Sequence, residues 1–127
     1  MRIEHVALYV EQLERMREFY STYFGAVSND GYHNPRTGLR TYFLSFSDGS
    51  RLELMNCLQM QREPKGQMRT GYIHLAFSLG SREAVDALTE RLRQDGYPVL
   101  SGPRVTGDGY YESCVLDPEE NQIELTV

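Results

Sequence analysis

Two histidines and two glutamates occupy matching places in the two halves of the 127-residue sequence. His5 is followed 48 residues later by Glu53, and His74 is followed 50 residues later by Glu124. Imidazole nitrogen and carboxylate oxygen are ligands that divalent Ni, Co, Zn, Mn or Fe accept, and two glutamates would neutralise both charges of such an ion. The four residues predict one metal site with two ligands from each half and with positions left for water or substrate.

Each of these residues taken alone has a commoner explanation. A histidine in a strand is more often a hydrogen-bonded structural residue, and a glutamate in a strand is usually a solvated surface side chain. Independent surface residues, however, have no reason to keep corresponding places in two halves of a chain. The correspondence therefore favours a shared site over four separate structural roles.

The segments around the two histidines are similar to each other. Residues 3–10 and residues 72–79 both have the composition of a strand, with the histidine two residues before an alanine in the frames H-V-A-L and H-L-A-F. Self-similarity at a fixed spacing is the sign of a repeated structural unit. We therefore expect the chain to contain two copies of one fold module.

An amphipathic helix is expected after each of these strands. In the first half, apolar residues from Val10 to Phe24 recur at helical spacing, and Gly25 follows as a stop. In the second half, Ser81 is the predicted N-cap and Gly96 the predicted end of the helix.

Further strands are expected behind each helix. The clearest are 41–46 and 51–55 in the first half and 110–116 and 121–127 in the second. The turns 47–50 and 117–121 lead into the strands that carry Glu53 and Glu124, each of which lies between two apolar residues. The second strand of each half is less sharply marked and is expected within residues 28–40 and residues 99–109.

The expected order is strand, helix and three strands, twice over. It predicts a single α+β domain over residues 1–127, in which 1–58 is the first βαβββ module, 59–70 a polar surface connector and 71–127 the second module. The two modules together are expected to form a cup-shaped mixed sheet with the helices on the outside.

The alternation of side chains along the strands separates the candidate ligands from the core. Alternate side chains face opposite sides of a sheet, so Leu52 and Leu54 share one face while Glu53 and Met55 occupy the other. The same count places His5 with Tyr9 on the face opposite the apolar residues. All four candidate ligands avoid the face that packs under a helix, and Tyr9 and Met55 share their side and are predicted to contact substrate.

Composition restricts the classes of partner. A net charge of -5 and a pI of about 5.2, without a dense run of Lys or Arg, argue against nucleic-acid binding. The apolar runs are too short to span a membrane, and no signal-like apolar run opens the sequence. We expect a cytoplasmic protein with a small-molecule partner, in which Cys57 and Cys114 remain free thiols.

Other motifs are weaker. His33 lies in a segment with Gly and Pro, where an exposed polar residue is the ordinary expectation, although a contact with substrate from a lid is conceivable. The stretch Gly107-Asp108-Gly109 lacks the helix and the lysine of a phosphate-binding loop.

The sequence resembles the vicinal oxygen chelate superfamily, which includes glyoxalase I, extradiol dioxygenases, fosfomycin-resistance proteins and methylmalonyl-CoA epimerase. The resemblance covers nearly the whole chain. It rests on I-E-H-V-A-L-Y-V from Ile3, G-Y-I-H-L-A-F from Gly71 and D-P-E-E-N-Q-I-E-L from Asp117. In the last motif Glu119-Glu120 replaces the family's Asp-Gly. The resemblance implies paired βαβββ modules around a metal ion, often within a homodimer.

The resemblance also implies a ligand set. Short bacterial glyoxalase I enzymes use His, Glu, His and Glu, which match His5, Glu53, His74 and Glu124, whereas the fosfomycin-resistance proteins and dioxygenases use two histidines and one glutamate. Enzymes of that short type are associated with nickel or cobalt, and the longer forms with zinc. Tyr9 stands where they carry an arginine for the glutathione carboxylate, which leaves the thiol open.

The resulting hypothesis is a metal-dependent lyase or isomerase of the glyoxalase I type, similar to lactoylglutathione lyase. A divalent ion would bind two adjacent oxygens of a small substrate and stabilise an enediolate, while Glu124, with Glu53 as partner, moves the proton. Two alternatives remain open. One is a protein of the same fold that binds a small molecule or an antibiotic without catalysis, and the other, ranked last, is an Fe(II) dioxygenase.

Overall fold

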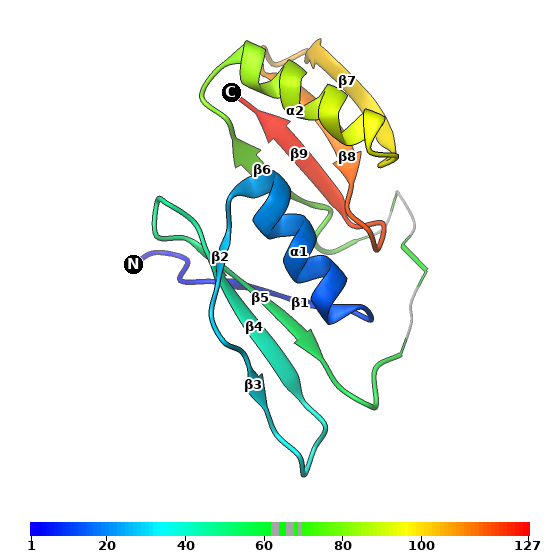
Figure 1. Cartoon of the computed structure of the whole chain (residues 1–127). Coiled ribbons are helices and arrows are strands. Elements are labelled where there is room, and N and C mark those ends of the chain that lie inside the picture. Colours follow the sequence, from blue (N-terminus) through cyan, green and yellow to red (C-terminus); the bar gives the residue numbers. More distant parts are fainter. Residues whose placement is uncertain (62–63, 66–67, 69) are drawn as a thin grey trace. The chain divides into compact units, whose positions relative to one another are not determined.

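The computed structural model describes residues 1–61, 64, 65, 68 and 70–127. The chain divides into two compact units, Met1–Glu63 and Pro64–Val127. Residues 62, 63, 66, 67 and 69 of the predicted connector lie outside the described residues. Within the described residues, each unit holds one helix and its own sheet (Figure 1).

The described residues of the first unit form one helix and five strands. They are β1 (Val6–Tyr9), α1 (Leu13–Phe24), β2 (Val27–Ser28), β3 (Tyr32–His33), β4 (Arg40–Ser45) and β5 (Arg51–Asn56). The strand order is β1-β5-β4-β2, with β3 also paired to β4. The strands β1 and β5 run parallel, while β4 and β5 form an antiparallel pair.

Helix α1 follows from its apolar spacing and from a glycine at its end. Leu13, Met16, Phe19 and Tyr20 are buried, at the i, i+3, i+4 spacing of one helix face. Each such burial contributes about 1.5–3 kcal/mol, which holds the helix against β4 and β5. The predicted stop is confirmed, because Gly25 adopts a left-handed φ of 65° that other residues reach only at a cost.

The weakly marked second strand of the first unit is split into β2 and β3. Asn29 lies between them, and its Oδ1 accepts hydrogen bonds from the backbone N–H of Gly31 at 3.1 Å and of Phe43 at 3.0 Å. The side chain of Asn29 thus takes the place of a backbone carbonyl as hydrogen-bond acceptor, and the strand is interrupted at this point. Gly31 has a φ of 83° and lies so close to Tyr42 that an added Cβ would come within 2.6 Å of the ring.

The second unit repeats the arrangement. Its elements are β6 (His74–Ser78), α2 (Arg82–Gln94), β7 (Val99–Val105), β8 (Tyr111–Leu116) and β9 (Gln122–Thr126). The strand order is β6-β9-β8-β7, with β6 and β9 parallel. In each unit, a parallel pair lies at one edge of the sheet. It consists of the strand before the helix and the last strand of the module.

The predicted ends of α2 are confirmed. The Ser81 hydroxyl accepts a hydrogen bond from the backbone N–H of Ala84 at 3.1 Å, which satisfies one of the open donors of the first turn. Beyond the last helical residue, Gly96 has a φ of 88° and its N–H donates to the carbonyl of Arg93. Val85 and Leu92 are fully buried on the sheet side of the helix.

The turn between β8 and β9 keeps its shape without a glycine. Oδ1 of Asp117 accepts from the backbone N–H groups of Glu119 and Asn121, each at 2.9 Å. Glu120 adopts a φ of 65°, where the related family motif has glycine. The network around Asp117 therefore maintains the turn at the cost of a strained residue.

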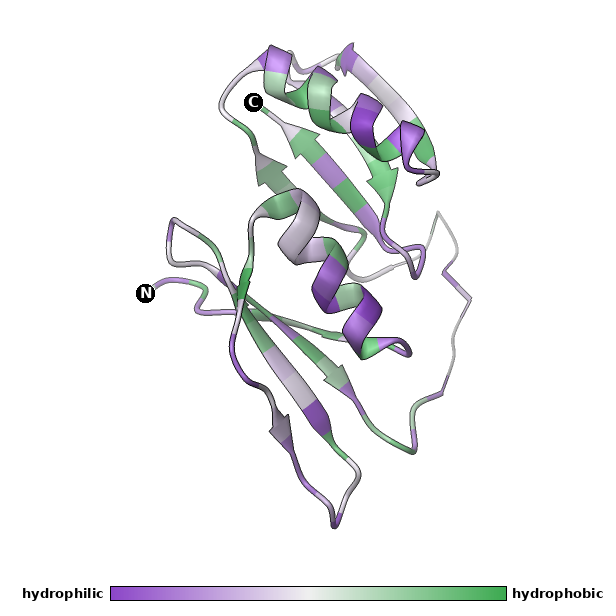
Figure 2. Ribbon diagram, in the orientation of Figure 1, coloured by the Kyte–Doolittle hydropathy of each residue, from purple (hydrophilic) through white to green (hydrophobic). Residues whose placement is uncertain are grey.

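Alternation along the strands places the core on one face of each sheet, as predicted. Leu52 and Leu54 are buried on the side of α1, and Ile123 and Leu125 are buried on the side of α2. Figure 2 shows the corresponding bands of apolar and polar residues along β5 and β9. The α+β class and the two βαβββ modules are confirmed, and in each module the polar residues between these leucines and isoleucines lie on the face without a helix.

Candidate functional site

The first unit places His5 beside Glu53. Ala7 of β1 is paired with Glu53 of β5, and His5 lies two residues before Ala7 on the same face. Ala7 carries only a methyl group, so the side chains of His5 and Glu53 have room to approach each other on this face of the sheet. Nε2 of His5 lies 3.7 Å from Oε2 of Glu53.

The second unit repeats this geometry with its own pair. Ala76 of β6 is paired with Glu124 of β9, and His74 lies two residues before Ala76. Nε2 of His74 lies 3.5 Å from Oε2 of Glu124. The sequence repeat therefore corresponds to a repeated contact, in which parallel pairing brings each histidine to the glutamate of its own module.

The chemistry of each pair fits a divalent metal ion. Two ligand atoms that each lie about 2.1 Å from one ion are roughly 3.0–3.4 Å apart at ordinary coordination angles. The observed distances of 3.7 and 3.5 Å are close to this range. The side chains of Glu53 and Glu124 are 15% and 22% exposed, and those of His5 and His74 are 39% and 36% exposed. The ligand atoms are thus accessible while the carboxylates are partly withdrawn from water.

Each unit supplies a pair of candidate ligands. Among the described residues, no group of three or more His, Cys, Asp or Glu side chains is placed to hold a metal ion. The union of the two pairs in one four-ligand site remains a prediction.

Glu124 has a second carboxylate as a neighbour. Glu112 of β8 is paired with Thr126, two residues from Glu124, so the two glutamates share one face of the sheet. Burial raises the pKa of Glu124, and the negative charge of Glu112 raises this pKa further, whereas His74 lowers it. Arg104 lies 3.4 Å from Glu112 and balances part of the charge. A raised pKa makes Glu124 a better proton acceptor than an isolated glutamate.

The imidazole ring of His5 contacts two further side chains, Glu4 and Phe43. Nδ1 lies 2.5 Å from Oε2 of Glu4, and the ring meets Phe43 edge to face at 5.4 Å between centroids. Nε of Arg51 donates to Oε1 of Glu4 at 2.8 Å. The hydrogen bond with His5 lowers the pKa of Glu4, and Arg51 lowers it further.

The sequence reasoning did not single out Glu112, Arg104 or Glu4. Alternation along β8 places Glu112 and Cys114 on one face of the sheet. Their position beside Glu124 depends on the pairing of β8 with β9, in which Cys114 lies directly opposite Glu124. No local pattern in the sequence reports that register.

Tyr9 and Met55 lie next to the candidate pair of the first unit. They are paired across β1 and β5, two residues beyond Ala7 and Glu53 on the same face. Tyr9 is 63% exposed. A substrate contact by either residue remains a prediction.

Cys57 and Cys114 are free thiols, as expected. Burial raises the pKa of Cys114, and the negative charge of Glu124 raises it further. Cys114 is therefore a thiol with little tendency to ionise, which is consistent with a structural role.

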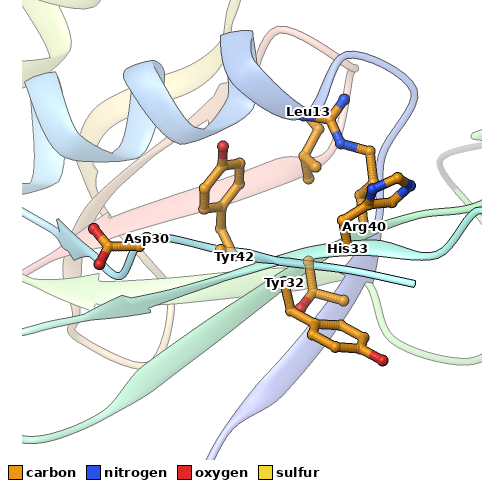
Figure 3. Close-up of a pocket in the computed structure, with 8 residues that line it drawn as sticks. Leu13, Asp30, Tyr32, His33, Arg40 and Tyr42 are labelled. Atoms are coloured by element: carbon orange, nitrogen blue, oxygen red, sulfur yellow. The ribbon is translucent and has the colours of Figure 1, made fainter. Parts of the chain in front are cut away.

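His33 lies at a small polar cavity of about 130 Å³ in the first unit. The lining includes Asp30, Arg40 and Tyr42, and in Figure 3 the side chains of His33 and Arg40 lie close together. Arg40 and Tyr42 both donate to Oε1 of Glu14 of α1, at 3.1 and 2.9 Å. The exposed position of His33 agrees with a surface residue, and the lid hypothesis has no further support.

The described residues contain no helix that is both long and apolar enough to cross a bilayer.

Comparison with known proteins identifies the family. A model of the Glyoxalase/Bleomycin resistance protein/Dioxygenase superfamily matches residues 2–125. The chain belongs to this superfamily. The uncharacterized protein YqjT of Bacillus subtilis (strain 168) is 31% identical over 127 residues, which cover 97% of this chain and 96% of YqjT.

Solved structures of the superfamily have the same fold. A possible glyoxalase from Bacillus cereus is 28% identical with a TM-score of 0.74, over 100% of this chain and 99% of that chain. The trypanothione-dependent glyoxalase I of Leishmania major is 22% identical with a TM-score of 0.79, over 99% of this chain and 86% of that chain. The superfamily includes enzymes such as glyoxalase I, and its members typically use a divalent metal, bind small molecules and form dimers.

Proposed function

We propose that this superfamily member is a metal-dependent lyase or isomerase of the glyoxalase I type. One divalent ion, nickel, cobalt or zinc, would be held by His5, Glu53, His74 and Glu124. The observation that carries the proposal is the repeated contact of histidine Nε2 with glutamate Oε2, at 3.7 Å in one unit and 3.5 Å in the other. Two matched pairs supply the two histidines and two glutamates of the short bacterial enzymes.

The roles of the residues follow from their surroundings. A divalent ion held by these residues would supply Lewis-acid chemistry, which makes a proton on the carbon next to a bound substrate oxygen easier to remove. Glu124 is the proposed base, acting when the substrate displaces it from the ion, because its carboxylate lies beside His74 on the open face and its surroundings in the metal-free protein raise its pKa. It accepts the proton from one carbon of the substrate and returns it to the neighbouring carbon. Glu53 is the proposed partner in this transfer.

The proposed substrate is a small oxygenated compound, with the hemithioacetal of a thiol and a 2-oxoaldehyde as the most concrete candidate. Tyr9 and Met55 would contact it, since both project beside the pair of the first unit. Tyr9 carries no charge to bind the carboxylate of glutathione, so we propose a different thiol. The enzyme of Leishmania major, which depends on trypanothione, is a precedent for such a difference within this fold.

We also propose that the protein works in the cytoplasm as a homodimer. The proposed dimer is supported by the superfamily, whose members typically form dimers. A β-sheet face lined with His and Glu suits a small-molecule partner better than a polyanion, which agrees with the net charge of -5.

Metal binding is the first test. The protein is stripped with a chelator, reloaded separately with Ni²⁺, Co²⁺, Zn²⁺ or Mn²⁺, and analysed for bound metal per chain. We expect one ion per chain, with loss of binding in His5→Gln and His74→Gln. His33→Gln is the matched control, since His33 is the remaining histidine of the sequence and lies at the small polar cavity of the first unit.

Activity is tested next, with methylglyoxal and a series of thiols that includes glutathione. Isomerisation that requires the added metal is the expected result. Failure to bind any ion would overturn the proposal and favour a binding protein without catalysis. Oxygen consumption that requires Fe²⁺ would favour the dioxygenase instead.

A further inference from the structure

The two histidines of the candidate site differ in what precedes them. His5 follows Glu4, whereas His74 follows Ile73 at the corresponding place of the repeat. The glutamates differ in the same way. Arg51 lies two residues before Glu53, whereas Gln122 lies two residues before Glu124. The two halves therefore differ at both of these positions beside the candidate ligands, and in the first unit the two residues contact each other.

Glu4 determines which nitrogen of His5 carries the hydrogen. An ionised carboxylate accepts hydrogen bonds and does not donate them, so the 2.5 Å contact between Oε2 of Glu4 and Nδ1 of His5 requires a hydrogen on Nδ1. In the neutral imidazole the lone pair is then on Nε2. Nε2 is the atom that lies 3.7 Å from Glu53, where a metal ligand is needed.

Arg51 holds Glu4 in this position. Its guanidinium donates to Oε1 of Glu4, which leaves Oε2 for His5. The same guanidinium lies 4.4 Å from the centre of the Phe43 ring, and Phe43 meets the His5 ring at an interplanar angle of 83°. Arg51 therefore holds Glu4 through a hydrogen bond, and its guanidinium also lies against the ring that contacts His5.

We propose that Glu4, held by Arg51, is a positioning residue that fixes His5 in the tautomer and orientation in which Nε2 is available to the metal. This inference rests on the proposed function, because it assigns His5 to the metal site. Partners that orient a metal-bound histidine commonly change metal affinity by about 10–100-fold. The corresponding residue before His74 is Ile73, whose side chain cannot accept a hydrogen bond, so only the first unit has a carboxylate at this place of the repeat.

The residues allow a clean test because they contribute little to stability. The side chain of Glu4 is 50% exposed and that of Arg51 is 35% exposed, and solvent screens an exposed ion pair so that its removal leaves the fold intact. Glu4→Ile and Arg51→Gln introduce the residues that the second unit carries at the same places. Glu14→Gln is the control, since Glu14 is also an exposed glutamate of the first unit paired with an arginine, and it contacts Arg40.

The tautomer is measured on the metal-free protein by the ¹⁵N chemical shifts of the histidine ring nitrogens, at about pH 8.5, where ordinary imidazoles are neutral. We expect wild-type His5 to carry its hydrogen on Nδ1. Glu4→Ile should shift His5 towards the Nε2–H form, while Glu14→Gln leaves the spectrum of His5 unchanged. A wild-type His5 with its hydrogen on Nε2, or an unchanged spectrum in Glu4→Ile, would overturn the inference.

Metal affinity gives the second measurement, by competition of Co²⁺ or Zn²⁺ with a chelating dye. We expect Glu4→Ile and Arg51→Gln each to weaken binding by about 10–100-fold, and Glu14→Gln to leave it unchanged. The double variant Glu4→Ile/Arg51→Gln should bind no more weakly than Glu4→Ile if Arg51 acts through Glu4. Unchanged affinity in Glu4→Ile would overturn the positioning role. If the wild type binds no metal, the proposed function fails, and the tautomer measurement still decides whether Glu4 orients His5.

Discussion

Glu112 lies diagonally across from Glu124, because it pairs with Thr126, two residues beyond Glu124 on the same face of the second sheet. Burial raises the pKa of Glu124 above 4.5, its ordinary value, and the negative charge of Glu112 raises it further. The folded protein without metal therefore binds a proton at Glu124 more tightly than the unfolded chain does.

The pH dependence of stability follows from this shift. The stabilisation by the proton is fully present below about pH 4.5 and is lost as the pH rises through the higher pKa of the folded state. In the chelator-treated protein, Glu124→Gln cannot ionise at this position. Its free energy of unfolding should therefore exceed that of the wild type at pH 7 by up to about 1 kcal/mol, because the carboxylate is partly exposed and solvent screens its charge.

Urea titrations of both proteins between pH 4 and pH 7 measure this difference. The difference in free energy of unfolding between wild type and Glu124→Gln should increase as the pH rises. A constant gap over that range would contradict the assignment of the raised pKa to Glu124.

The same substitution tests the proposed base. Glu124→Gln should lower kcat/KM of the metal-loaded protein by about 10²–10⁴-fold, because the amide cannot accept the proton. Circular dichroism should show an intact fold. Glu90→Gln, which changes an exposed glutamate of α2, serves as the control and should keep full activity. Wild-type turnover in Glu124→Gln would remove Glu124 from the mechanism.

Removal of the metal should lower thermal stability. An ion at about 100 times its dissociation constant stabilises the folded state by roughly 2.7 kcal/mol, which corresponds to several degrees in Tm. The shift on adding Ni²⁺, Co²⁺ or Zn²⁺ to the stripped protein is measured by thermal denaturation. It should vanish in His74→Gln and persist in His33→Gln, and an equal shift in both variants would point to metal binding elsewhere.

Glu120→Gly should stabilise the second unit. Glu120 adopts a φ of 65°, and a non-glycine residue in this region costs about 1–2 kcal/mol. Glycine removes that cost but also gains freedom in the unfolded chain, so the expected net gain is about 0.5–1 kcal/mol. Chemical denaturation of the variant measures it, with Glu119→Gly as a comparison that should not stabilise. A loss of stability in Glu120→Gly would show that side-chain contacts of Glu120 outweigh the strain.

A buried pair of hydroxyls couples α2 to its sheet. Oγ1 of Thr89 lies 2.6 Å from Oγ of Ser113, and both side chains are fully buried. Thr89→Val should cost about 1–3 kcal/mol, since it leaves the hydroxyl of Ser113 without this partner. Thr89→Val/Ser113→Ala should recover part of that loss, which a double-mutant cycle measures. Strictly additive losses would indicate that the hydrogen bond contributes nothing.

Much of the fold could be predicted because it depends on short-range rules. The alternation in Leu52-Glu53-Leu54 separates core from open face, since neighbouring side chains in a strand point to opposite sides. Ser81 and Gly25 mark helix ends through backbone groups within a few residues. The split of the second strand at Asn29 was not predictable in this way, because it depends on a hydrogen bond to Phe43.

The sequence by itself determined the two modules, the ends of their helices and the faces on which His5, Glu53, His74 and Glu124 lie, because these depend on periods of two and 3.6 residues along the chain. Tertiary structure decided the register between strands, and with it the contacts of each pair. The side chain of Glu112 lies beside Glu124 only because β8 pairs with β9 in one register. Glu4 reaches Arg51, 47 residues away, only because β1 lies parallel to β5. Such contacts result from the packing of the whole sheet against its helix, which no local pattern encodes.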